Sequence, residues 1–194
     1  MKIGRVSVLA VMITSAQFGM AQSGFPAEHK PALLTPENFA RAESDLYFGG
    51  VVKNGGFGKF DHTRSPAPLD KQTIIRLNRD TLYSAAVFDL DAGPVTITLQ
   101  NAGKRFMSLQ VIDEDQYTFG VFYKPGSITL ARKDVGTRYA LAAVRTLVDP
   151  ADTQDLKEVH ALQDAIKVSQ KQAGKFEIPD WDQEIGRASC RERV

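Results

Sequence analysis

The sequence predicts an α+β fold, in which a mainly antiparallel β-sheet carries an N-terminal helix and a longer C-terminal helix packed on it. From Gln72 to Val148 the apolar residues recur with period two, and short turn-forming stretches divide the region into runs of strand length. Before and after this region, apolar residues recur at three- and four-residue spacings, as on one face of a helix. The strand connections are too short for parallel crossovers, so an antiparallel sheet is expected.

The N-terminal helix is predicted to begin at Thr35. Thr35 suits an N-cap, Pro36 suits the first helical position, and Glu37 favours the positive end of the helix dipole. Gly49-Gly50 is expected to weaken this helix and to end it. Its apolar stripe consists of Phe39, Ala42, Leu46 and Tyr47.

Asn54–Lys59 is rich in glycine but lacks the spacing and the Lys-Ser/Thr ending of a phosphate-binding P-loop. A turn is therefore predicted here, followed by a loop through Ser65–Pro68.

Strands are predicted at Thr73–Leu77, Thr81–Leu90, Val95–Leu99, Arg105–Asp113, Thr118–Tyr123, Ile128–Leu130 and Arg138–Val148. Hairpin-like connections are predicted at Asp91–Pro94, Asn101–Lys104 and Pro125–Ser127. The clean alternation in Val95–Leu99 indicates a strand with one buried and one solvated face.

The C-terminal helix is predicted to start after Asp149-Pro150, with Asp152 or Thr153 as its cap, and to run to about Gln170. Its apolar stripe consists of Leu156, Val159, Leu162 and Ile166. The half-apolar segment Phe176–Trp181 is expected to dock on the domain or to lead into a further one.

Both ends of the chain are expected to lie outside the folded domain. Lys2 and Arg5 precede a short apolar run, and small residues follow up to Ala21, as in a secretory signal peptide at 1–21. Residues 22–34 are predicted to be a flexible leader, and 35–183 the folded domain. Residues 184–194 match the translation of a common sequencing adaptor, so we expect this segment to be an artefact. The chain is then expected to be an N-terminal fragment of a longer protein.

These boundaries predict a periplasmic or secreted protein with no membrane span after signal cleavage, because the apolar run is too short to cross a bilayer. Without 1–21 and 184–194 the chain loses five basic and two acidic residues, so its net charge falls from +1 to about −2. Such a surface offers no basic stripe for nucleic acid. Cys190, the one cysteine, lies in the suspect tail.

The segment from Asn78 to Ser84 concentrates hydrogen-bonding side chains between two predicted strands, namely Asn78, Arg79, Asp80, Thr81, Tyr83 and Ser84. Such density can line a ligand site, but Asn, Asp and Thr also cap the backbone of turns. A second polar group, with Gln110, Asp113 and Tyr117, ends a later strand. Both interpretations remain open at this point.

These two segments resemble a family of mostly exported bacterial proteins with an N-terminal domain of unknown function 1254, normally followed by a domain of unknown function 1214. Leu77 and Arg79 depart from the family pattern, which often has proline and asparagine there. The resemblance spans about Thr35 to Asp182 and implies a missing, largely β C-terminal domain, but no activity. The matching residues are Asn78, Asp80, Thr81, Leu82, Tyr83, Ser84, Asp89, Leu90, Gly93 and Pro94, then Arg105, Ser108, Leu109, Gln110 and Asp113.

Neither a metal site nor a cofactor is expected. Asp113, Glu114 and Asp115 are adjacent, so along a strand they point to different sides, and the three histidines stand apart. His160 is expected to be a packed or surface residue.

The leading functional hypothesis is an exported protein whose α+β domain forms part of a small-molecule or glycan pocket, or a partner surface for the missing domain. The alternative is a periplasmic hydrolase in which Asp80 and Asp113 act as paired carboxylates, with Arg79 or Arg105 holding an anion. A third hypothesis is a scaffold for the missing domain alone.

Overall fold

The computed structural model describes residues 31–68, 70 and 78–182, and it has the predicted α+β class. The predicted strand Thr73–Leu77, the signal peptide and the adaptor-like tail lie outside these residues. No helix within the described ranges is long and apolar enough to cross a membrane. The elements are α1 Phe39–Lys53, β1 Asp61–His62, β2 Thr81–Asp89, η1 Leu90–Ala92, β3 Val95–Leu99, β4 Met107–Asp113, β5 Thr118–Phe122, β6 Gly126–Leu130, α2 Arg132–Val135, β7 Tyr139–Leu147, α3 Thr153–Asp164 and β8 Lys167–Gln170.

The strands form two sheets, a five-stranded one in the order β1-β2-β7-β4-β5 and a three-stranded one in the order β6-β3-β8. All their ladders are antiparallel, as predicted. The three predicted hairpin-like connections are wrong, because each of them joins strands of different sheets. β7 is central and pairs with both β2 and β4, so most pairings join segments far apart in the sequence.

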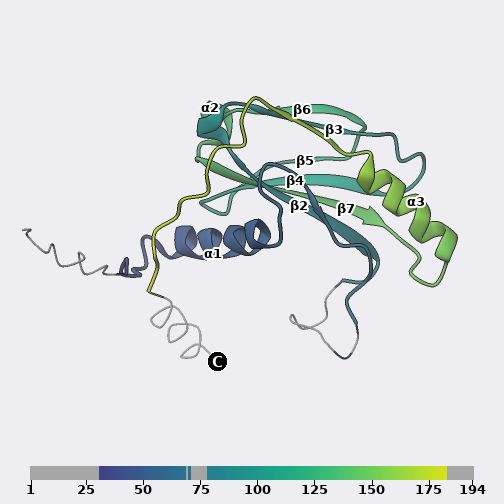
Figure 1. Cartoon of the computed structure of the whole chain (residues 1–194), viewed down its shortest axis with the longest axis horizontal. Helices are drawn as coiled ribbons and strands as arrows, with labels where there is room; N and C mark the ends of the chain where they lie inside the picture. Colours follow the sequence, from purple (N-terminus) through teal and green to yellow (C-terminus); the bar gives the residue numbers. More distant parts are fainter. Residues whose placement is uncertain (1–30, 69, 71–77, 183–194) are drawn as a thin grey trace, which may run out of the picture. The chain divides into compact units, whose positions relative to one another are not determined.

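The two faces of the five-stranded sheet are covered differently. On one face, Phe88 of β2 and Val111 of β4 pack against the three-stranded sheet through Ile97 and Leu130. Farther along this face, α3 covers Leu82 with Val159. On the opposite face, α1 places Phe48 on Val87 and Leu141. Figure 1 shows α1 on one side of β2 and β7, with β3 and β6 on the other.

Helix α1 differs from its prediction at both ends. Its N-cap is Asn38 instead of Thr35, and the Asn38 side chain accepts a hydrogen bond from Thr35 N at 2.8 Å. The helix continues through Gly49-Gly50 to Lys53. Burial of Phe48 with Val51 and Val52 in the core outweighs the low helix propensity of the two glycines.

Helix α3 starts as predicted, with Asp152 as N-cap accepting a hydrogen bond from Gln154 N at 2.8 Å, but it ends at Asp164. The predicted extension to Gln170 is wrong, since Lys167–Gln170 forms β8 and pairs with β3. Pairing satisfies backbone groups at an edge of β3, and the half-buried Val168 packs on the core. The spacing of apolar residues within a short segment carries no information about a distant pairing strand such as β3.

Candidate functional site

The sheet face that carries α1 divides into two halves along the strands. Odd-numbered residues of β2 and β7 share this face, because the ladder pairs Asp89 with Tyr139, Val87 with Leu141 and Tyr83 with Arg145. The half that contains Asp89, Val87, Leu141 and Tyr139 lies under α1 and the C-terminal segment, and we call it the covered half.

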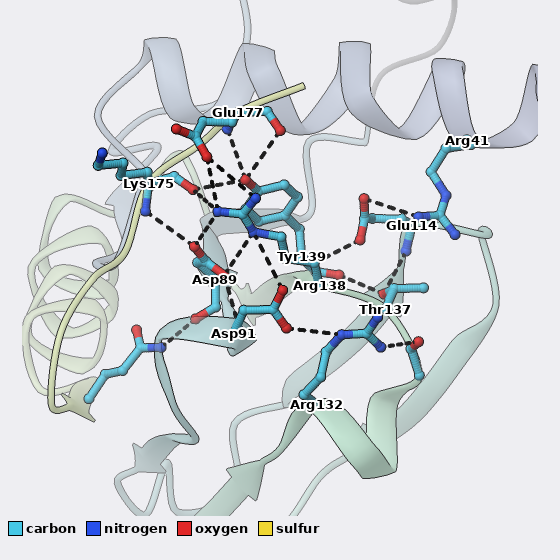
Figure 2. Close-up of polar contacts among 12 residues, drawn as sticks. Arg41, Asp89, Asp91, Glu114, Arg132, Thr137, Arg138, Tyr139, Lys175 and Glu177 are labelled. Atoms are coloured by element: carbon cyan, nitrogen blue, oxygen red, sulfur yellow. Dashed lines mark hydrogen bonds and ion pairs between the residues drawn. The ribbon is translucent and has the colours of Figure 1, made fainter. Parts of the chain in front are cut away.

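The covered half is a dense polar network around Asp89 (Figure 2). Arg138 binds both carboxylate oxygens of Asp89 at 3.0 and 3.2 Å, and the backbone N–H groups of Asp91 and Lys175 donate to the same side chain. Burial opposes ionisation of Asp89, but these hydrogen bonds and the Arg138 charge outweigh it and lower its pKa. The network therefore holds the segment after β8 against β2.

Tyr139 completes this attachment. Its hydroxyl donates to the Lys175 carbonyl at 2.8 Å and accepts from Glu177 N at 2.8 Å, while the Arg138 guanidinium lies 4.9 Å from its ring centre. Gly174 has φ +77°, and a Cβ there would meet the Asp89 carboxylate at 2.5 Å, so the sequence needs glycine at this position.

A second polar group of the covered half lies under the first turns of α1. Arg41 of α1 reaches Glu114 at 3.3 Å, and Glu114 accepts from Tyr139 N at 2.8 Å (Figure 2). Asp45 of α1 is buried and accepts from Trp181 Nε1 at 2.9 Å. Burial raises the pKa of both carboxyl groups above their ordinary values.

The other half of the same face is not covered by α1 and is arranged in rows across the strands. One row runs from Tyr83 through Arg145 to Ser108, which are ladder partners, and Tyr123 follows on the next strand by continuation of the β4–β5 register. We call this surface the open patch. It consists of Thr81, Tyr83, Ala85, Ser108, Gln110, Tyr123, Ala143, Arg145 and Leu147.

The open patch has a low floor beside the row. Ala85 pairs with Ala143, and Ala143 pairs with Gln110. Ala85 also packs against the cluster under α1, so these two alanines form the boundary between the two halves. Both alanines are half-buried, whereas Leu147 is 43% exposed and Tyr123 is 64% exposed. Short alanine side chains thus lie beside longer polar and aromatic ones on the strands, which is a composition typical of sites for small polar molecules.

The arginines of the patch region are unusual within the described residues, because they lack carboxylate partners. Arg145 lies over the Tyr83 ring at 5.7 Å, and its buried Nε has no acceptor. Arg79, two residues before β2, likewise has a buried Nη1 without an acceptor. Buried N–H groups are normally hydrogen-bonded, so these donors need an explanation.

The structure separates the residues proposed from the sequence. Thr81, Tyr83 and Gln110 belong to the open patch, and Asn78 and Arg79 lie at its end, just before β2. Asn78 also caps its own turn, since it accepts from Asp80 N at 2.8 Å and donates to the Thr81 hydroxyl. The turn-capping interpretation therefore describes Asn78 correctly.

Ser84 lies on the opposite face of β2. Its hydroxyl is 2.8 Å from His62 Nδ1, and burial followed by the Arg64 charge lowers the His62 pKa. A serine beside a neutral histidine could act as a nucleophile and base. Ser84 is only 1% exposed, however, so a substrate could not reach it, and we assign the pair a structural role.

The remaining proposed residues, Asp113 and Tyr117, lie at the far end of the sheet. Asp113 accepts from the backbone N–H groups of Asp115 and Tyr117, both at 2.9 Å, and so caps the β4–β5 turn. Tyr117 is 72% exposed on that turn. Neither residue reaches the open patch.

The proposed pairing of Asp80 with Asp113 is incompatible with the strand register. Asp113 and Phe88 both pair with Ala140, so Asp113 is level with a residue eight positions after Asp80. At about 3.3 Å per residue the two acids are roughly 26 Å apart. Glycosidase carboxylates lie about 5 to 9.5 Å apart, so these two cannot act together.

Two further residues considered from the sequence, Arg105 and His160, have structural partners. Arg105, considered as an anion holder, binds Asp155 of α3 through two nitrogens. His160 is packed, with Nε2 2.7 Å from the Arg64 carbonyl. Searched over the described residues, the structure contains no group of three or more His, Cys, Asp or Glu residues able to hold a metal ion.

Sequence reasoning missed Arg145 as a site residue and treated Ser108 only as part of a motif. Arg145 is the one charged residue within Tyr139–Leu147, where it interrupts a largely apolar strand. That interruption is the signal that could have identified it, because a charge in a central strand needs either a partner or a function.

Comparisons with known proteins agree with this fold. The family profile described as "Protein of unknown function (DUF1254)" matches residues 57–170. The crystal structure of the VPA0106 protein from Vibrio parahaemolyticus is similar, with a TM-score of 0.54 and 17% sequence identity over 69% of this chain. The matched region spans 36% of that longer chain. No curated protein matches the sequence significantly.

Proposed function

The chain belongs to the DUF1254 family of proteins of unknown function, and we propose that its domain binds a small polar molecule on the open patch. The observation that carries this proposal is the pairing of half-buried Tyr83 with half-buried Arg145 on adjacent strands, next to Ala143 and the buried Ser108. Side chains held by strands keep their geometry better than side chains on loops, as a binding site requires.

The polar groups of the patch offer varied hydrogen bonding. Arg145 donates only, the Tyr83 hydroxyl can donate or accept, and the Gln110 amide does both. Exposed Tyr123, with the neighbouring ring of Phe106 at 6.1 Å, adds a flat apolar surface at the edge. A small polar molecule or a glycan unit with a hydroxyl-rich face and one apolar face fits these groups.

We place this binding function outside the cytoplasm, in the periplasm or secreted, on the strength of the signal-like residues 1–21. A bacterial strain that produces the full coding sequence with a C-terminal tag provides the test. We expect the tagged protein in the periplasmic fraction, shortened at its N-terminus. An unprocessed protein in the cytoplasm would contradict the proposal of export.

A second candidate function is a partner surface for a further domain of the same protein. It is favoured by the exposed apolar rim of the patch, where Phe106, Val121 and Leu147 are each 42–43% exposed. Exposed apolar groups gathered on one surface are typical of an interaction site. A largely β second domain seated on the rim would close the patch from above, so the two functions are compatible.

The binding proposal is tested by screening small sugars, amino acids and organic acids against the purified chain, with thermal stabilisation as the readout. Compounds that stabilise the chain are then titrated against Tyr83→Ala, with Tyr117→Ala as matched control on the distant turn. We expect the affinity to fall at least about tenfold in the first variant and to be unchanged in the second, since a lost aromatic contact and hydroxyl matter only at the site.

Binding that is equal in Tyr83→Ala and the wild type would refute the location. To separate lost binding from lost folding, the midpoint of urea unfolding is measured for each variant. Tyr83→Phe provides a second substitution with minimal change in shape.

A further inference from the structure

We infer that the ligand of the open patch carries a compact oxyanion, a carboxylate or a phosphate, and that Arg145 binds it, with Arg79 before β2 as a second arginine to be tested. This inference rests on the proposed binding function and specifies its chemistry. It is carried by the unsatisfied hydrogen-bond donors of the two arginines and by the absence of acidic residues from the patch.

Five other arginines of the described chain bind carboxylates. The pairs are Arg41 with Glu114, Arg64 with Asp164, Arg105 with Asp155, Arg132 with Asp91, and Arg138 with Asp89. Arg79 and Arg145 have no such partner among the described residues, and each has a fully buried nitrogen without an acceptor. An arginine cannot lose its proton to escape this cost. Both side chains are half-buried, so an acceptor from outside the chain would bind the accessible nitrogens of each guanidinium.

Arg145 is held in a position suited to an oxyanion. It lies on the central strand β7 between Tyr83 and Ser108, and the Tyr83 ring supports its guanidinium at 5.7 Å. A planar guanidinium offers two parallel N–H groups that match the two oxygens of a carboxylate or phosphate. The Tyr83 hydroxyl is a neighbour that could donate to the same anion, whereas Ser108 is buried and only 4% exposed.

The charges around the patch favour an anion. None of the residues that define the patch is acidic, and Asp89, Asp113 and Glu114 lie toward the opposite end of the strands. The nearest acid in sequence to Arg79 is Asp80, which is exposed at the start of β2. Beside Leu147, Asp155 and Glu158 are paired with Arg105, so the charge of Arg145 itself has no acidic partner among the described residues, which favours an anion.

The experiment titrates inorganic phosphate, malonate and glucose into the purified full chain at constant ionic strength, with isothermal calorimetry and thermal stabilisation as readouts. The variants are Arg145→Met, Arg145→Lys and Arg79→Met. Arg132→Met is the matched control, because Arg132 is a surface arginine paired with Asp91 away from the patch. All variants are first compared by urea unfolding.

We expect phosphate or malonate to bind the wild type and Arg132→Met alike. Affinity should fall at least about tenfold in Arg145→Met and less in Arg79→Met, and Arg145→Lys should recover only part of it, because lysine keeps the charge without the paired N–H groups. If Arg145→Met fails to fold, Arg145→Lys carries the comparison with the control.

Two results would overturn the inference. One is saturable binding of the anions that Arg145→Met and Arg145→Lys leave unchanged, and the other is no saturable binding of either anion to the wild type. Binding of glucose that depends on Tyr83 but not on Arg145 would overturn the inference while supporting the proposed function. Ligand affinity that is unchanged by substitution of either Tyr83 or Arg145 would refute both the inference and the proposed function.

Discussion

The two halves of the α1-bearing sheet face use the same residue types for different purposes. In the covered half, Arg138 lies over Tyr139 at 4.9 Å, and in the open patch Arg145 lies over Tyr83 at 5.7 Å. Arg138 binds Asp89 and Glu177, whereas Arg145 has a buried nitrogen with no acceptor. The two pairs thus differ in whether the described chain supplies acceptors for the arginine.

The presence or absence of an acceptor for the arginine distinguishes a structural role from a binding role better than burial or residue type does. A satisfied network fixes chain segments, here residues 174–177 against β2. An unsatisfied donor on a rigid strand leaves free energy to be gained by a ligand. The same substitution should therefore change the stability of the fold strongly in the covered half and weakly in the open patch.

The largest effect is expected from Arg138→Met, which should destabilise the fold by about 2 kcal/mol. The substitution leaves the buried Asp89 carboxylate without its bidentate partner, and partial exposure of Arg138 moderates the cost. Arg145→Met should change stability by less than about 0.5 kcal/mol, since no carboxylate loses a partner. Urea unfolding of both variants measures the difference.

The Arg138 effect should also depend on pH. Because the folded pKa of Asp89 is lowered below the ordinary 3.8, its stabilisation is complete above that value and is lost as pH falls through the folded pKa. The difference between wild type and Arg138→Met should therefore shrink in acid below the ordinary pKa. An equal loss of stability in Arg138→Met and Arg145→Met would break the comparison.

A smaller effect, about 1 to 2 kcal/mol, is expected from Tyr139→Phe. The phenol loses a hydrogen bond to the Lys175 carbonyl and leaves Glu177 N without an acceptor. Tyr83→Phe, the matched change in the open patch, should be nearly neutral for stability. Hydrogen exchange should show faster opening of 174–178 in Tyr139→Phe alone, and equal protection in both variants would count against the assigned roles.

The smallest effect tests an exception within the covered half. Asp45 Oδ1 is buried without a partner, and burial raises the pKa of this carboxyl above its ordinary 3.8. A raised folded pKa means that the ionised form costs stability, progressively as pH rises from the ordinary value through the folded value. Asp45→Asn should therefore stabilise the neutral-pH protein, by less than about 1 kcal/mol, with no gain in acid.

Trp181, the one tryptophan of the chain, reports on this substitution directly, because its Nε1 donates to Asp45. An asparagine can still accept that bond, so the emission maximum should remain unchanged in Asp45→Asn and shift to the red in Asp45→Ala. A loss of stability in Asp45→Asn at neutral pH would mean that the carboxylate charge stabilises the fold, contrary to this prediction.

Local sequence signals predicted the individual strands well and their partners poorly. The boundaries of Val95–Leu99 are correct and those of Thr81–Leu90 are correct to one residue, because alternation and turn residues act over a few positions. The hairpin predictions and the helical assignment of Lys167–Gln170 are wrong, because β3 pairs with β6 and β8 instead of with its sequence neighbours. Pairing energy depends on segments that a local window cannot include.

The same limit applies to the candidate site. Tyr83 and Gln110 were proposed from their polar segments and share the open patch, but the equally polar Asp80 and Asp113 are separated by the length of the sheet. Arg145 was overlooked since its strand appears apolar. Which polar residues share a surface follows from register, and register follows from long-range pairing.

By itself the sequence determined the α+β class, the capping of α3 by Asp152, most strand positions and membership of a family through its two polar segments. These features depend on propensity, periodicity and turn chemistry, which operate within a few residues. Only the tertiary structure decided that Arg138 pairs with Asp89, while Arg145 and Arg79 have no carboxylate partner within the described residues. Whether an arginine has a carboxylate partner depends on which residues the sheet brings together. This is decided only when β2, β7 and β4 are aligned.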